Sequence, residues 1–160
     1  MNAQVKNKVF VVFLTILIFI AAFLFYKHIS YKKKMNIHEK VIMHELNIKL
    51  TRIILYLTQK HNIKYIEFDI YKAPKNRSSY VTFFKYIYID PYKKNTNIFY
   101  NDDTLFYVVL HELTHIILKQ RICKNSLRFK NMFLNLYHIA IKLKMLDHNK
   151  IEKYHTDDNA

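Results

Sequence analysis

Glycine and tryptophan are absent from the 160-residue chain, which also has a single cysteine and two prolines. Without glycine there is no Gly-rich phosphate-binding loop, because the dinucleotide and P-loop motifs both need glycine for close approach of the backbone to phosphate. One cysteine cannot form an intramolecular disulfide, nor can it supply the thiolates of a structural zinc cage. The composition therefore excludes nucleotide-dependent enzymes of those classes and any domain held together by disulfides.

Acidic residues are also scarce, with 12 Asp and Glu against 26 Lys and Arg, for a net charge of +14. The first 34 residues hold six of the basic residues and no acid, so the remainder carries 20 basic against 12 acidic residues, a net charge of +8. Tyrosines interspersed with lysines, such as Tyr80, Tyr86 and Tyr88, could stack on single-stranded nucleic acid. They are more typical of amphipathic strands, and abundant lysine is typical of AT-rich coding sequences. We therefore do not expect nucleic acid as the partner.

One long apolar run extends from Val9 to Tyr26 without a charge, and lysines flank it on both sides. At 1.5 Å per residue it covers most of a hydrocarbon core of about 30 Å. No small-residue cleavage pattern follows it, which favours an uncleaved transmembrane helix over a signal peptide. More lysines follow the run than precede it, so the positive-inside rule favours a cytosolic C-terminal domain. The sequence thus predicts a single-pass membrane anchor in residues 1–34.

Residues 35–146 are expected to form one α+β domain with a small, mostly antiparallel sheet. Apolar residues at helical spacing predict a helix over 37–61, and alternation of apolar and polar residues predicts a strand over 65–71. Residues rich in β-branched and aromatic side chains predict two further strands at 80–84 and 86–90. Two more helices are expected, from about 102 to 121 and from about 126 to 146, with Asp102, Asp103 and Thr104 as candidate caps of the first. Residues 147–160 read as a polar tail.

The chemical motif of the chain is H-E-x-x-H at residues 111–115. Positions i and i+4 of a helix share one face, so His111 and His115 can reach the same metal ion. Glu112 can then take the proton of a metal-bound water, whose pKa zinc lowers to about 7. The pattern predicts Zn²⁺ as the cofactor, His111 and His115 as its ligands, and Glu112 as the general base.

The surroundings of the motif support a site within the domain. Apolar residues from Leu105 to Leu118 surround it on nearly every side, which is typical of a buried helix. Histidines and a glutamate in such a helix are costly unless a partner satisfies them, and a metal does so. A second His-Glu pair, His44-Glu45, has Ile48 where the second histidine would be, and is expected to lie on the surface.

Residues 86–89 (YIYI) and 101–115 (NDDTLFYVVLHELTH) resemble the WLM and SprT-like zinc metallopeptidases, in particular the short membrane-anchored versions of large DNA viruses. The resemblance extends from about Ile87 to Tyr137. It implies a minimal zincin fold, in which a small sheet lies beside the active-site helix and the metal lies between two helices. It also implies His111 and His115 as ligands and Glu112 as the general base.

The chain departs from this family at the third ligand. A histidine in a pattern H-x-x-x-F follows the motif in the family, whereas Asn125 occupies that place here, four residues before Phe129. An amide oxygen is a poorer zinc ligand than imidazole. Three alternatives follow: Asn125 coordinates weakly, His138 on the next helix reaches the metal, or the site holds little or no zinc.

Two functions remain open from the sequence. The first is a membrane-anchored zinc metallopeptidase that hydrolyses a peptide or protein substrate lying as an extended strand along the sheet edge. The second is a catalytically degenerate protein of zincin fold that acts as a binding or structural module. The third zinc ligand distinguishes them, because catalytic zinc normally has three protein ligands.

Overall fold

The computed structural model describes residues 3–33, 35–61, 63–120 and 126–154. The chain separates into two compact units, Met1–Met35 and Asn36–Ala160. We describe each unit by itself.

The first unit contains one helix, α1 (Ala3–Lys33), on which the described apolar side chains are exposed. Within the described ranges, none of the helices combines the length and the apolar character needed to cross a membrane. The prediction of a transmembrane anchor in residues 1–34 is therefore wrong.

The second unit is a small α+β domain, as expected, and its elements follow the sequence pattern closely. Helix α2 (Ile37–His61) has the predicted bounds. The other elements are shorter than predicted: β1 (Asp69–Lys72), β2 (Tyr80–Thr82), β3 (Tyr86–Ile89), α3 (Asp102–Leu118) and α4 (Leu127–Lys142).

The sheet has the order β1-β3-β2, with β1 parallel to β3 and β2 antiparallel to β3. It is therefore a mixed sheet, whereas a mostly antiparallel one was predicted. The chain leaves β1, passes the position of β3, forms β2 at the edge and returns as β3 through a hairpin. Strand β3, the last of the three in the sequence, lies between β1 and β2, and β1 therefore has a parallel neighbour.

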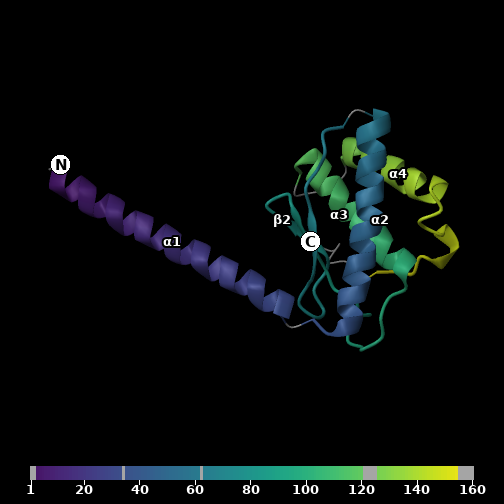
Figure 1. Ribbon diagram of the computed structural model, residues 1–160, viewed down its shortest axis with the longest axis horizontal. Coiled ribbons are helices and arrows are strands. Elements are labelled where there is room, and N and C mark those ends of the chain that lie inside the picture. Colours follow the sequence, from purple (N-terminus) through teal and green to yellow (C-terminus); the bar gives the residue numbers. More distant parts are fainter. Residues whose placement is uncertain (1–2, 34, 62, 121–125, 155–160) are drawn as a thin grey trace. The chain divides into compact units, whose positions relative to one another are not determined.

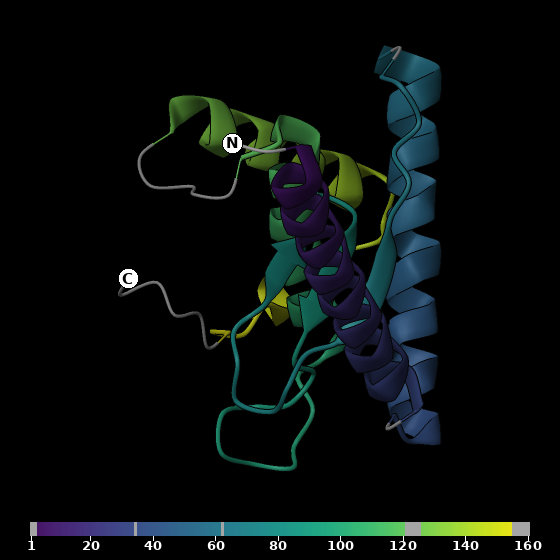
Figure 2. The same cartoon turned by 90° about the vertical axis from the view of Figure 1, so that its left-hand side faces the viewer.

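The two faces of the sheet carry different residues. Alternation along β3 places Ile87 and Ile89, both fully buried, on one face and Tyr86 and Tyr88 on the other. Helix α3 packs against β2 and β3 and also contacts α2 and α4, and α2 contacts β1 (Figure 1). Figure 2 shows α2 running alongside the strands. Helix α3, which bears the motif, is thus the central element of the domain.

Residues 147–154 belong to this domain, although the sequence reads as a polar tail from Asp147. A short 3₁₀ helix (His148–Lys150) contacts α3, and Thr104 Oγ1 accepts a hydrogen bond from the backbone N–H of Glu152 at 2.7 Å. Tyr154 is buried and its hydroxyl donates to the backbone oxygen of Asp90 at 2.9 Å. These hydrogen bonds and the buried ring of Tyr154 hold a segment whose composition is otherwise polar.

The hairpin between β2 and β3 has a tight turn made of two phenylalanines. Phe83 and Phe84 both have positive φ angles, 53° and 48°, and the N–H of Lys85 donates to the oxygen of Thr82 at 3.1 Å. This geometry normally calls for Asn-Gly, because a Cβ is disfavoured in the left-handed region. In a chain without glycine, the turn keeps this strain.

Phe83→Asn is expected to stabilise the protein by about 0.5–1 kcal/mol, because asparagine tolerates the left-handed conformation and the Phe83 side chain is 73% exposed. Chemical denaturation of both full-length proteins measures the difference. Ile98→Asn is the matched control, an exposed apolar residue outside the positive-φ set, and should give no gain. A loss of stability in Phe83→Asn would contradict the strain argument.

Candidate active site

Both ends of helix α3, which carries the motif, are capped. Asn101 is its N-cap, and the Asn101 side-chain oxygen accepts a hydrogen bond from the N–H of Thr104 at 2.8 Å. Asp102 and Asp103 follow in the first turn, where the positive end of the helix favours acidic residues. The cap therefore lies one residue before the earliest predicted candidate, because asparagine satisfies the free N–H groups as well as aspartate does.

The two motif histidines lie side by side on one face of α3. Their ring centroids are 5.1 Å apart, a separation compatible with two imidazoles on one zinc ion with zinc–nitrogen bonds of roughly 2.0–2.1 Å. Phe129 of α4 contacts both rings, with centroids 5.0 Å from His111 and 4.7 Å from His115. The imidazole pair is thus covered by an aromatic wall from the neighbouring helix, while His111 stays partly exposed.

The C-terminal end of α3 fixes the orientation of His115. Lys119 adopts a left-handed conformation with φ 52°, and the N–H of Gln120 then donates to the oxygen of His115. This turn brings the backbone oxygen of Gln120 to 2.7 Å from Nδ1 of His115. A carbonyl only accepts hydrogen bonds, so Nδ1 carries the proton and Nε2 presents a lone pair. Metal-binding histidines are typically held by such a second bond.

Burial of His115 lowers the pKa of its imidazole, and this effect outweighs the hydrogen bond to Gln120, which raises it. A lowered pKa favours the neutral ring at neutral pH. A neutral imidazole is the form that binds a metal.

Glu112 is nearly fully buried, with 4% of its surface exposed. Ser79, the residue before edge strand β2, donates its hydroxyl hydrogen to Oε1 of Glu112 at 2.5 Å. The hydroxyl of Ser79 thereby fixes the position of the Glu112 carboxyl group. The contact also connects the motif helix to the sheet edge.

The described residues do not supply a third metal ligand at this site. His138 lies exposed on α4 and contacts Tyr137, with ring centroids 5.8 Å apart. Throughout the described ranges, no group of three or more His, Cys, Asp or Glu could hold a metal ion. Asn125 and Cys123 lie outside the described residues. The structure thus brings His111 and His115 together and leaves His138 apart from them.

Other histidines and the tyrosines of the sheet have other environments. His44 and Glu45 are exposed on α2, as expected for a surface pair. His148 pairs through Nδ1 with the hydroxyl of Tyr137, and His155 lies outside the described residues. Tyr80 stacks on Tyr88 with centroids 4.8 Å apart and an interplanar angle of 9°, so these ring faces pack on each other.

Two contacts at the site were missed by sequence reasoning. The contact of Ser79 has no recognisable pattern in the sequence, because it requires the sheet to pack on α3. The Gln120 contact had a weak signal. A helix that ends soon after His115 must turn back, and its terminal carbonyls then lie near the last turn.

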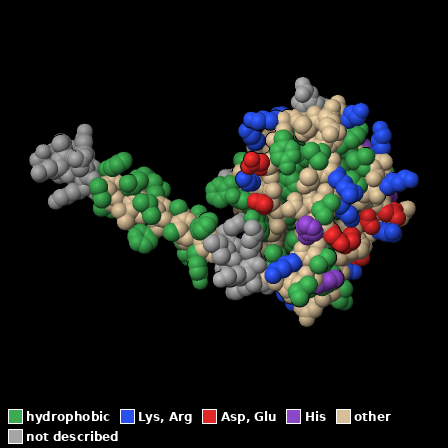
Figure 3. Space-filling model, viewed as in Figure 1, with side chains coloured by type: hydrophobic (Ala, Val, Ile, Leu, Met, Phe, Trp, Pro, Cys, Tyr) green, Lys and Arg blue, Asp and Glu red, His purple; other side chains and the backbone are tan. Residues whose placement is uncertain are grey.

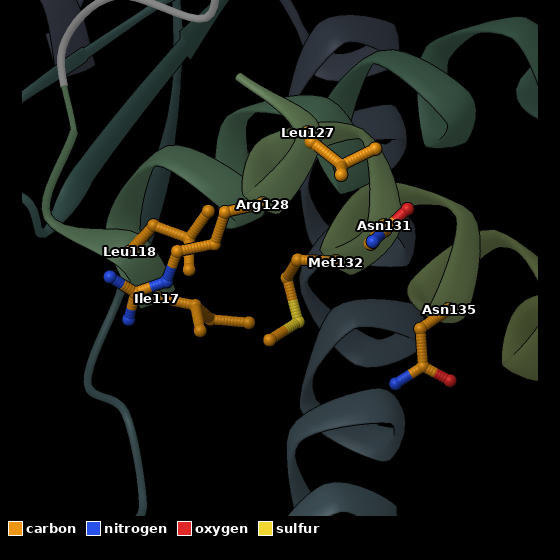
Figure 4. Close-up of a pocket in the computed structure, with 7 residues that line it drawn as sticks. All are labelled: Ile117, Leu118, Leu127, Arg128, Asn131, Met132 and Asn135. Atoms are coloured by element: carbon orange, nitrogen blue, oxygen red, sulfur yellow. The ribbon is translucent and has the colours of Figure 1, made fainter.

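A cavity of about 730 Å³ lies elsewhere, between the end of α3 and the start of α4 (Figure 4). It is lined by Ile117 and Leu118 of α3 and by five residues of α4 between Leu127 and Asn135. None of the lining residues is His, Cys, Asp or Glu, and none belongs to the motif. The cavity therefore lacks acid–base groups and is separate from the candidate site.

Comparison of the chain with models of known protein families, with curated proteins and with solved structures finds no match.

Proposed function

We propose that the domain is a zinc-dependent metallopeptidase, with His111 and His115 holding the metal and Glu112 acting as general base. The observation that carries this proposal is the imidazole pair on α3, with ring centroids 5.1 Å apart and with Nδ1 of His115 bonded to the backbone of Gln120. That hydrogen bond leaves Nε2 available as a ligand. The donor set is the one that zinc favours, imidazole nitrogen beside an acidic residue.

A bound zinc ion would supply a water of lowered pKa and would polarise the carbonyl of the peptide bond. The residues of the chain provide proton transfer and positioning. Glu112 accepts the proton of that water and donates it to the leaving amine, and Ser79 keeps the Glu112 carboxylate in place through its hydroxyl. Phe129 packs against both imidazoles and holds them in position.

The edge strand suggests how a substrate would bind. Strand β2 pairs with β3 on one side, and no other strand pairs with it in the described ranges. Ser79 immediately precedes it and contacts Glu112. An extended peptide that added a strand to β2 would therefore pass beside the general base. We propose a peptide or protein chain in extended conformation as the substrate class.

Zinc titration of the full-length protein, with metal analysis after dialysis, tests the proposal. We expect one zinc per chain in the wild type and loss of stoichiometric binding in His111→Ala and in His115→Ala. His44→Ala is the matched control, because His44 begins the same motif without a second histidine, and should keep its zinc. His138→Ala should also keep it, because His138 points to solvent.

Two outcomes would decide against the enzyme. Absence of zinc from the wild type would remove the metal centre altogether. Stoichiometric zinc, without hydrolysis of unfolded protein or peptide substrates, would instead favour the degenerate binding or structural module.

A further inference from the structure

Helix α2 has a second apolar face besides the one in the core. Leu46, Leu50 and Ile53 are buried against the domain. On the outer side, Val41, Ile48 and Leu55 are 47%, 41% and 43% exposed, and they follow one another at intervals of seven residues. An apolar repeat of seven residues is the pattern of a helix that packs along another helix.

Charged residues flank this stripe in an ordered way. At 100° per residue, Glu45 and Arg52 lie on the same flank of the stripe, and His44 and Thr51 lie on the other flank. Glu45 precedes Ile48 by three residues, and Arg52 follows it by four. Both side chains are exposed, and neither takes part in an ion pair within the described part of the chain. Figure 3 shows this face of the domain, with hydrophobic side chains among charged ones.

We propose that two copies of the chain associate through α2, antiparallel to each other, with a two-fold axis at Ile48. This arrangement places Ile48 against Ile48 of the second copy and Val41 against Leu55. Antiparallel helices bring equivalent flanks together, so Glu45 of each copy lies beside Arg52 of the other. In a parallel pair, Glu45 would instead face His44 and Thr51. Charge complementarity therefore selects the antiparallel pair.

Helix α4 has a second exposed apolar stripe, and comparison with it shows why α2 is the better interface. Leu127, Leu134 and Ile141 also follow one another at intervals of seven residues and are exposed. Every charged residue of α4 is basic, so two α4 helices would repel each other along their flanks. Of these two exposed stripes in the described part of the chain, the one on α2 has both signs of charge on one flank and the one on α4 does not.

The length of the apolar stripe on α2 sets the expected strength of the association. Val41 to Leu55 spans about 21 Å of helix. One helix on each side makes a small interface, of the size found in weak and reversible complexes. We therefore expect a dimer that forms at high protein concentration.

Disulfide trapping in the full-length protein tests the arrangement, with Cys123→Ser as the background. Antiparallel helices packed about 8–10 Å apart bring residues at the axis within reach of a disulfide. Ile48→Cys should form a covalent dimer under mild oxidation. Val41→Cys and Leu55→Cys should each stay monomeric alone and should cross-link to each other when the two proteins are mixed. Leu134→Cys, with 39% exposure on α4, is the matched control and should not cross-link.

Charge exchange provides the second measurement. Glu45→Arg or Arg52→Glu, added to Ile48→Cys, creates two like-charge pairs per dimer and should lower the trapped fraction about fivefold. The double exchange Glu45→Arg/Arg52→Glu restores both pairs and should recover the dimer. Cross-linking of Val41→Cys or Leu55→Cys to itself would overturn the antiparallel arrangement. Equal trapping at Leu134→Cys, or no trapping at Ile48→Cys, would overturn the interface.

Discussion

Glu112→Gln is expected to lower the rate of peptide hydrolysis by about 10²–10⁴-fold, the usual contribution of a general base. The substitution keeps the shape of the side chain, and the amide oxygen can still accept the hydroxyl hydrogen of Ser79. It removes the negative charge that accepts a proton. Because the histidines are untouched, zinc content and thermal midpoint should stay at their wild-type values.

Glu67→Gln is the matched control for this experiment. Glu67 is an exposed glutamate that pairs with Lys85, and its removal should leave the rate of hydrolysis unchanged. The measurement is the initial rate on a peptide substrate with zinc in excess, for the three proteins side by side. A Glu112→Gln protein as fast as the wild type would show that Glu112 is not the base.

The local features of this fold could be predicted, because they depend on neighbouring residues. The apolar spacing of residues 37–61 was enough for the bounds of α2, and the apolar surroundings of the motif were enough for the burial of α3. Ser126 was the predicted start of α4 and is its N-cap. The neighbouring position of His111 and His115 follows from helix geometry alone.

Features that depend on the meeting of distant segments could not be predicted in this way. The parallel pairing of β1 with β3 and the contact of Ser79 with Glu112 join residues whose local sequence carries no sign of the partner. The apolar run at residues 9–26 predicts a membrane-spanning helix from local hydropathy, whereas within the described ranges none of the helices is long and apolar enough to cross a membrane.

Glu39→Gln is expected to destabilise the folded domain by about 2–4 kcal/mol at neutral pH, the cost of breaking a buried charged network. Glu39 is buried at the start of α2, where its Oε2 accepts from the N–H of Asn36 and its N–H donates to the Asn36 side chain, each at 2.8 Å. Its Oε1 accepts from the ammonium group of Lys72 on β1 and from the hydroxyl of Tyr92 at 2.7 Å. One carboxylate thus joins α2, the sheet and the loop that leads to α3.

The pH dependence of this loss distinguishes the network from simple packing. Burial alone would raise the pKa of Glu39, but the hydrogen bonds from Lys72, Tyr92 and Asn36, with the charge of Lys72, outweigh it and hold the pKa below its ordinary value of 4.5. A lowered folded-state pKa stabilises the domain above the unfolded value, and this stabilisation is lost as the pH falls through the folded value. The gap in unfolding free energy between wild type and Glu39→Gln should therefore be widest at neutral pH and should narrow in acid.

Denaturation curves at several pH values measure this gap. Glu67→Gln is the exposed counterpart, for which we expect no measurable gap. A gap independent of pH would mean that Glu39 stabilises the domain by its shape rather than by its charge.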